Sequence, residues 1–312
     1  MTSHGPAVWL GFTALVIALL VIDLGVLNRR GHVLSMKEAG SWSAGLVCLA
    51  LLFGGFLWWR EGSAHALEYL TGYLIELSLS VDNLFVFILI FQYFSVPAIA
   101  QPKVLKWGIL GAIVLRGVMI AIGAILLHRF HWIIYVFGGI LVFTGIRMLL
   151  SDGKEIHPEK NPVVRLAKRV LPIEPGYDED RFTCRNVQGK LFFTPLILVI
   201  IMVEWSDLVF AIDSIPAIFA VTNDPFLVYS SNVFAILGLR ALYFVLAGAM
   251  DRFHYLKAGI SAILIFIGIK MAVSGWYKLP TLAALAVILA VLGIAVAASL
   301  LRPRETVAPA TD

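Results

Sequence analysis

Long apolar runs alternate with short polar segments along almost the whole chain. Nine of these runs are long enough to cross the ~30 Å hydrocarbon core of a bilayer, because an α-helix rises ~1.5 Å per residue. The third and sixth runs exceed that thickness, so we expect these two helices to be broken. The pattern predicts an all-α polytopic membrane protein with nine transmembrane helices, at about 6–28, 40–59, 66–94, 104–127, 132–150, 191–221, 228–250, 257–276 and 280–301.

The composition agrees with a membrane protein. The chain is 60% hydrophobic and 14% charged, whereas soluble domains carry about 25% charged residues. The net charge of +4 comes from basic residues in the loops, so it does not indicate nucleic-acid binding. Cys48 and Cys184 form neither a disulfide framework nor a CxxC motif. The first run lacks a basic leader and a small-residue cleavage site, and we interpret it as a retained anchor.

The distribution of Lys and Arg predicts the orientation in the membrane. When alternate loops are taken as cytoplasmic, these loops hold 17 Lys and Arg residues, and the loops on the opposite side hold three. Cytoplasmic loops are generally enriched in positive charge. We therefore expect the N-terminus outside and the C-terminus in the cytoplasm.

Two short motifs recur at one spacing. Arg-Phe-His at 129–131 recurs at 252–254, and Gly-Ile-Arg-Met at 145–148 recurs as Gly-Ile-Lys-Met at 268–271, both 123 residues later. Runs three to five therefore echo runs six to eight. Because three is odd, the two copies cross the membrane in opposite senses, which predicts a 3+3 inverted repeat typical of secondary transporters. The glycines expected to permit close helix packing are Gly138, Gly139, Gly145 and Gly268.

The repeat divides the chain into five parts. The loop between the two copies is polar and proline-rich, and we expect one short amphipathic helix at about 163–171 and a solvated acidic cluster at 178–180. The parts are two peripheral helices (1–64), the first three-helix repeat (65–151), a cytoplasmic loop (152–190), the inverted second repeat (191–276), and a last helix with the C-terminal tail (277–312).

Carboxylates lie inside the two longest apolar runs, where an ionised acid costs about 2.5 kcal/mol or more. Glu76 and Asp82 in run three recur as Asp207 and Asp213 in run six, and Glu204 precedes Asp207 by one turn. On a continuous helix, side chains six residues apart point ~240° apart around the axis. A local break in each helix would bring them together and free backbone carbonyls as ligands.

The polar groups near these acids are oxygen donors. Asn83 and Ser214 adjoin the acids, and Asn232 is an additional polar candidate. All seven His residues lie in loops or at the ends of runs. Carboxylate and amide oxygens suit Mg²⁺, Ca²⁺ or Mn²⁺ rather than softer metals. The residues thus predict a midplane site for one hard divalent cation, and they leave open which cation it is.

Two buried arginines offer an alternative explanation of the acids. Arg116 and Arg240 lie in the middle of runs four and seven, 124 residues apart. Because an unpaired guanidinium at this depth is costly, we expect each within salt-bridge reach of an acid in run three or six. Such structural ion pairs would still leave at least two carboxylates to bind a cation or a proton. Asp23, a lone acid in the first run, is interpreted as structural.

The acidic stretches at 76–83 and 203–217 resemble the two signature stretches of the TerC/Alx integral membrane family, in the LysE-like transporter superfamily. Further matches lie at 220–226, 231–240 and 266–271, and the similarity is greatest to the Alx branch. The family takes its name from tellurium resistance, and Alx-type members are associated with manganese export. The resemblance therefore implies Mn²⁺ as the exported ion and a bacterial-type inner membrane as the location.

Two functions from different classes follow. The first is an exporter of a divalent cation, with protons as counter-ions, the lipid bilayer as its surroundings and no permanently bound cofactor. The second is a membrane scaffold in a tellurium or metal stress-resistance complex, without transport activity. An intramembrane enzyme is disfavoured, because no Ser, Cys or His nucleophile–base pair lies at membrane depth.

Overall fold

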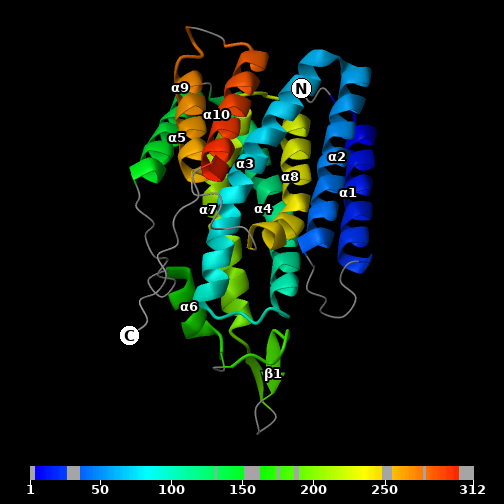
Figure 1. Cartoon of the computed structure of the whole chain (residues 1–312), viewed down its shortest axis with the longest axis vertical. Helices are drawn as coiled ribbons and strands as arrows, with labels where there is room; N and C mark the ends of the chain where they lie inside the picture. The colour runs from blue at the N-terminus through cyan, green and yellow to red at the C-terminus, as the bar shows by residue number, and fades with distance from the viewer. Residues whose placement is uncertain are drawn as a thin grey trace.

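The computed structural model describes residues 4–26, 36–130, 132–150, 162–173, 176–185, 190–247, 255–276 and 279–301. In these residues the chain is helical apart from one short two-stranded sheet, and most helices run along the long axis of the molecule (Figure 1). The elements are α1 (Pro6–Val26), α2 (Met36–Glu61), α3 (Ser63–Tyr93), α4 (Gln101–Arg129), α5 (Ile133–Leu150), α6 (Pro162–Val170), β1 (Thr183–Arg185), β2 (Leu191–Phe193), α7 (Leu196–Phe219), α8 (Pro225–Ala247), α9 (Leu256–Ala272) and α10 (Thr281–Leu301).

The chain has the architecture of an all-α polytopic membrane protein. Within the described ranges, seven helices are long and apolar enough to cross a bilayer: α1, α2, α3, α4, α5, α8 and α10. Helices α7 and α9 match the other two predicted spans in position, but they are not among the seven. Helix α7 carries three carboxylates, and α9 is only 17 residues long.

The expected breaks in the two longest spans are not present. Helix α3 runs without interruption from Ser63 to Tyr93, and α7 runs from Leu196 to Phe219 with Pro216 inside it. Pro216 lies in the last turn of α7, where the helix is about to end, so its missing N–H removes a single intrahelical hydrogen bond. Side chains on α3 and α7 therefore follow ordinary helical periodicity.

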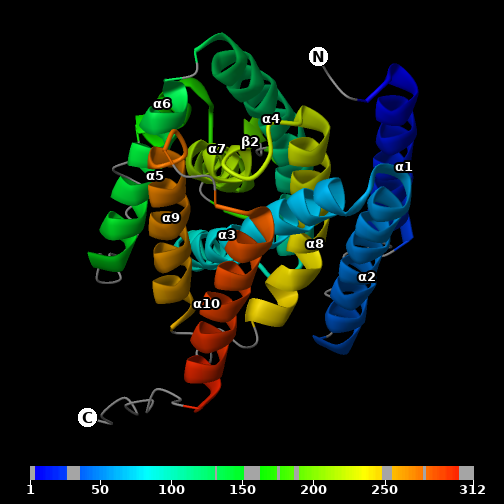
Figure 2. The ribbon, with the colours of Figure 1, turned by 90° about the horizontal axis from the view of Figure 1, so that it is seen from above.

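Helices α3 and α7 occupy the middle of the bundle (Figure 2). Helix α8 packs against α3 and α4 packs against α7, while α5 and α9 pair along one edge and α1 and α2 lie along the opposite edge. An aromatic cluster fixes the second edge, because Phe12 of α1 and Phe53 of α2 meet Phe226 and Phe234 of α8. The helices that carry the predicted acids thus lie in the enclosed part of the bundle, together with α8.

Helices α5 and α9 cross at glycines. A Cβ atom added to Gly138 would lie 2.8 Å from the carbonyl oxygen of Gly268, and one added to Gly145 would lie 2.9 Å from that of Ser261. Contacts that advance along α5 thus retreat along α9, so the two helices are antiparallel. Close packing at Gly138, Gly145 and Gly268 is confirmed. For Gly139 it is wrong, since a Cβ atom there would meet nothing within 4 Å.

The described parts of the predicted cytoplasmic loop (162–173 and 176–185) pack against the bundle. Helix α6 confirms the short helix expected at about 163–171, and its buried residues Val164 and Ala167 pack into the same core as Leu196 of α7. Strands β1 and β2 pair in antiparallel register, with Cys184 opposite Phe192. Figure 1 shows α6 and β1 together at one end of the molecule.

Candidate functional site

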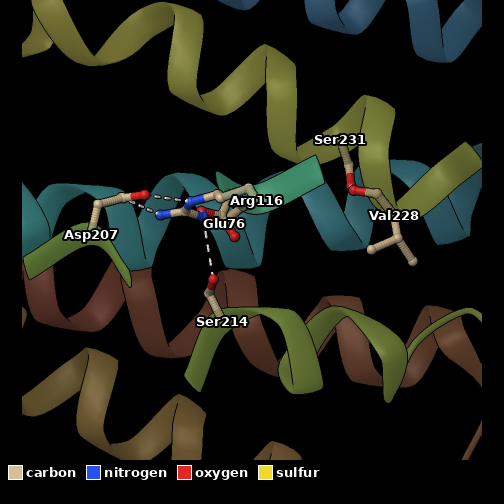
Figure 3. A network of polar contacts seen from close by, with 6 residues as sticks. All are labelled: Glu76, Arg116, Asp207, Ser214, Val228 and Ser231. Carbon is tan, nitrogen blue, oxygen red and sulfur yellow. Dashed lines mark hydrogen bonds and ion pairs between the residues drawn. The ribbon is translucent and has the colours of Figure 1, made fainter. Parts of the chain in front are cut away.

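Arg116 lies at the centre of the buried polar network in Figure 3. It projects from α4 and is fully buried. Its guanidinium forms a two-pronged ion pair with Asp207 of α7, with Nη2–Oδ1 and Nε–Oδ2 distances of 2.8 and 3.2 Å. The Nη1 atom forms an ion pair with Oε1 of Glu76 on α3 and lies 3.2 Å from Oγ of Ser214. One arginine therefore joins three helices.

The helical period explains which residues meet Arg116. Asp207 and Ser214 are seven residues apart, so they lie almost one above the other on the same face of α7. Asp213 lies one residue earlier and points to another face. Its Oδ1 accepts a hydrogen bond of 2.9 Å from the Thr144 hydroxyl of α5. The expected pairing of Asp207 with Asp213 at one point depended on a broken helix, and α7 is continuous.

Glu204 lies one turn before Asp207 and packs onto a glycine. A Cβ atom added to Gly111 of α4 would lie 2.1 Å from Oε1 of Glu204, so any larger residue at position 111 would require this carboxylate to move. The Oε2 atom is buried and has no hydrogen-bond partner among the described residues. Glu204 is half-buried and thus places a second carboxylate, after the buried one of Asp207, on the side of α7 that faces α4.

The two buried arginines, Arg116 and Arg240, have ion-pair partners in different parts of the chain. Arg240 of α8 is nearly fully buried, and its Nη2 lies 2.8 Å from Oδ1 of Asp23 in α1. The expectation of an acid from α3 or α7 holds for Arg116, but the acid described beside Arg240 is Asp23. Sequence reasoning missed this pair because α1 lies outside the repeat. The ion pair agrees with the structural role expected for Asp23. Its partner, Arg240, is the arginine of the second half that corresponds to Arg116 of the first.

Three polar side chains on one face of α3 carry buried atoms without a described partner. These atoms are Oε2 of Glu76, Oγ of Ser80 and Nδ2 of Asn83. On α8, Asn232 is fully buried and neither atom of its amide is hydrogen-bonded within the described structure. Asp82 belongs to α3, but its side chain lies outside the described residues, so its place in the predicted site stays a prediction.

Two pockets flank the network. The first, of about 240 Å³, is lined by Asn83, Thr144, Arg147, Asp213 and Lys257 among others. The second, of about 850 Å³, is lined by Glu68, Asp224 and Lys270. No group of three or more His, Cys, Asp or Glu residues that could hold a metal occurs among the residues described. In the arrangement described, Arg116 is the cation bound by Glu76 and Asp207.

The formal charges at the centre do not cancel. When both carboxylates are ionised, Glu76 and Asp207 together carry two negative charges against the one positive charge of Arg116. Such buried charges persist only when they are paired and hydrogen-bonded. Oε2 of Glu76 nonetheless has no partner among the described residues. The arrangement can therefore accept one more positive charge, or exchange Arg116 for a cation.

A bundle of apolar helices with ionisable groups enclosed among them defines a polytopic integral membrane protein. The chain belongs to the integral membrane protein TerC family, whose model matches residues 61–307. This membership confirms the resemblance in the acidic stretches.

Curated relatives match along nearly the full length. The chain is 51% identical over 308 residues to "Uncharacterized membrane protein STKORF319" of Myxococcus xanthus, covering 98% of this chain and 95% of the relative. It is 50% identical over 300 residues to "Putative membrane-bound redox modulator Alx" of Escherichia coli (strain K12), covering 93% of each. An uncharacterized membrane protein of Rickettsia felis is 42% identical, with 94% of this chain and 97% of the relative covered. No solved structure matches the chain.

Proposed function

We propose that the protein is a transporter that exports a hard divalent cation, and that Mn²⁺ is its substrate. The observation that carries the proposal is the excess of buried carboxylate over buried guanidinium around Arg116. Ionisable residues inside membrane helices commonly mark ion pathways. The identity of the ion rests on the family resemblance and on the oxygen donors, which suit Mn²⁺.

An inverted repeat is supported by the α5–α9 crossing. Shifting Gly138 and Gly145 by the 123-residue offset of the repeated motifs gives Ser261 and Gly268. The two observed contacts, Gly138 with Gly268 and Gly145 with Ser261, therefore exchange into one another. A two-fold axis perpendicular to two antiparallel helices produces this exchange. If α5 and α9 cross the bilayer, that axis lies in the membrane plane, as in transporters with inverted repeats.

The two pockets also occupy corresponding positions in the two halves. The first pocket is lined by Arg147 and Met148, and the second by Lys270 and Met271, at the same 123-residue offset. In the proposed orientation, the first opens near the cytoplasmic ends of α5 and α9, and the second lies at the opposite ends. A transporter with alternating access needs one vestibule on each side of its site.

Each predicted residue then has a role. In our proposal Arg116 neutralises the charge of the acids while no metal is bound. When the metal binds, the ion pairs of Arg116 with Glu76 and Asp207 break. Arg240 is the corresponding charge-balancing residue of the second half, and protons are the counter-ions. The ligand set proposed for the bound ion comprises Glu76, Asp82, Asn83, Glu204, Asp207, Asp213 and Ser214, with Asn232 as an additional polar ligand.

The direct test is Mn²⁺ transport by the purified protein in proteoliposomes. Asp213→Asn removes one charge at nearly constant volume and keeps an acceptor for the Thr144 hydroxyl. We expect the variant to fold and its Mn²⁺ affinity to fall about tenfold or more, since a neutral amide replaces a hard anionic ligand. Asp178→Asn, on an exposed surface ion pair, is the control. Wild-type transport by the Asp213 variant would refute its role, and absence of Mn²⁺ flux in the wild type would refute the function.

The alternative is a membrane scaffold without transport. A scaffold gives no reason for a carboxylate in a polar pocket, so the Mn²⁺ flux separates the two functions. The name of the E. coli relative, a putative membrane-bound redox modulator, suggests a redox role as a further alternative. The described side chains around Arg116 are carboxylates and a hydroxyl, and the two cysteines lie apart, on α2 and β1. The site as described therefore favours binding a cation over thiol chemistry.

A further inference from the structure

One face of α3 carries a row of polar side chains whose buried atoms have no described partner. Glu76, Ser80 and Asn83 are spaced four and three residues apart, so they line one stripe of the helix. Glu76 and Ser80 are fully buried, and Asn83 is 2% exposed. Each contributes one atom without a hydrogen-bond partner among the described residues.

The stripe connects two features that the proposed function needs. At the C-terminal end of the stripe, Asn83 lines the first pocket together with Asp213. At the N-terminal end of the stripe, Glu76 forms an ion pair with Arg116. Seven residues of helix cover about 10 Å, so Ser80 lies roughly midway between pocket and ion pair. Nearby charges are Arg116 on α4, Asp207 and Asp213 on α7, and Arg147 and Lys257 in the pocket.

Unpartnered polar atoms in a row are costly in a membrane protein. Most buried polar groups bond either to protein or to ordered water. The lipid core offers no partner, and polar groups there are satisfied only inside the protein or along a water-filled cavity. The row contains both acceptors and donors, and water can satisfy both kinds.

We propose that this stripe is a hydrated passage that leads a hard divalent cation from the first pocket to Glu76 and Asp207. A hard cation sheds its waters reluctantly, so a passage lined by hydroxyl and amide groups can exchange those waters stepwise. The proposal rests on the proposed transport function, and it assigns Ser80 as a lining residue of the path.

The test measures the access of water to position 80, independently of transport. In full-length protein lacking both native cysteines (Cys48→Ser, Cys184→Ser), Ser80→Cys is exposed to a small cationic methanethiosulfonate reagent in membrane vesicles of each orientation. Ser78→Cys is the matched control. Ser78 is also buried, but it lies on the opposite face of α3, and its hydroxyl donates to the Leu74 carbonyl at 2.5 Å.

We expect Ser80→Cys to react about tenfold faster or more than Ser78→Cys, because only a hydrated thiol ionises readily. The reaction should be faster from the side on which the first pocket opens, and Mn²⁺ should slow it. Asn83→Cys, at the pocket end, should react as well and guards against a folding defect specific to position 80. Equal or absent reactivity at positions 80 and 78 would overturn the passage.

A second variant links the passage to transport. Ser80→Val fills the path with an apolar group, and we expect the initial rate of Mn²⁺ flux to fall at least tenfold, whereas Ser78→Val should leave it near the wild-type rate. If wild-type protein moves no Mn²⁺, the proposed function fails while the labelling result still decides whether the passage is hydrated. If Mn²⁺ flux is normal in Ser80→Val, the ion takes another route.

Discussion

At the scale of single residues, the molecule is organised around one guanidinium. Arg116 is fully buried and binds Glu76 and Asp207 from two other helices. Arginine suits this position because its planar fork can bind two carboxylates at once, which a lysine ammonium does with less geometric definition. The side chain is therefore both a structural tie and, in our proposal, the group that a metal ion displaces.

Replacement of Arg116 should be strongly destabilising. Arg116→Gln leaves two buried carboxylates without their cation, and breaking a buried ion pair from one side costs about 3–5 kcal/mol. Arg116→Lys keeps the charge and should cost less. The measurement is reversible unfolding in mixed detergent micelles. Arg181→Gln is the control, because its pair with Asp178 is exposed and should contribute less than about 1 kcal/mol. Near-wild-type stability of Arg116→Gln would mean that the pair is not maintained in the membrane.

Part of this residue pattern could be predicted from the sequence. Mid-span arginines need acids, and that rule correctly placed an acid beside Arg116. The choice of acids failed where it relied on broken helices. With continuous helices, the period alone puts Ser214, and not Asp213, on the face of Asp207. The hydrogen bond between Asp213 and Thr144 depends on how α5 packs against α7. No motif or spacing in the sequence predicts that packing.

At the scale of elements, the apolar runs predicted the helices well. Each of the nine runs coincides with a helix, because length and hydrophobicity are local properties. Helix continuity was predicted wrongly, because the length of the two runs and the spacing of their acids were read as breaks, whereas α3 and α7 each run without interruption. Close helix crossings were predicted from the glycines. Gly139 shows the limit of that rule, because it lies on a face of α5 that meets no other helix.

The α5–α9 crossing should tolerate no side chain at its contact points. Gly138→Ala and Gly268→Ala place a Cβ atom 2.8 and 2.6 Å from a backbone oxygen of the facing helix, so the helices must separate. We expect each to cost about 1–3 kcal/mol by overpacking. Gly139→Ala, one residue away and facing open space, should be neutral or stabilise the helix by up to about 1 kcal/mol. Unfolding in detergent measures all three, and equal stabilities would place the crossing elsewhere.

At the scale of the whole molecule, α1 supports a half of the bundle to which it does not belong by sequence. Asp23 neutralises Arg240, and Phe12 packs in the aromatic cluster on α8. The repeated motifs could not reveal this contact, because α1 and α2 have no counterpart in the repeat. The first arginine is satisfied within the repeat and the second from outside, so the described arrangement is asymmetric.

Loss of the Asp23 carboxylate should weaken the whole bundle. Asp23→Asn leaves Arg240 buried with neutral acceptors only, including the Asp23 backbone carbonyl at 3.1 Å. We expect a cost near the lower end of ~3–5 kcal/mol. Asp180→Asn is the matched control, because its pair with Lys103 is partly exposed. Equal stability of the two variants would show that α1 docks without the help of this ion pair.

Alternating access predicts that the two pockets respond to the ion in opposite directions. Met148 lines the first pocket and Met271 the second, at positions related by the 123-residue offset. With each replaced by cysteine in a background without native cysteines, labelling rates report the opening of each vestibule. A ligand shifts a conformational equilibrium only by its difference in affinity for the two states. Saturating Mn²⁺ should therefore raise one labelling rate and lower the other, and Asp213→Asn should abolish both changes. Rates that move together, in protein shown separately to bind Mn²⁺, would contradict a rocking exchange between the two halves and favour a fixed pathway open to both sides.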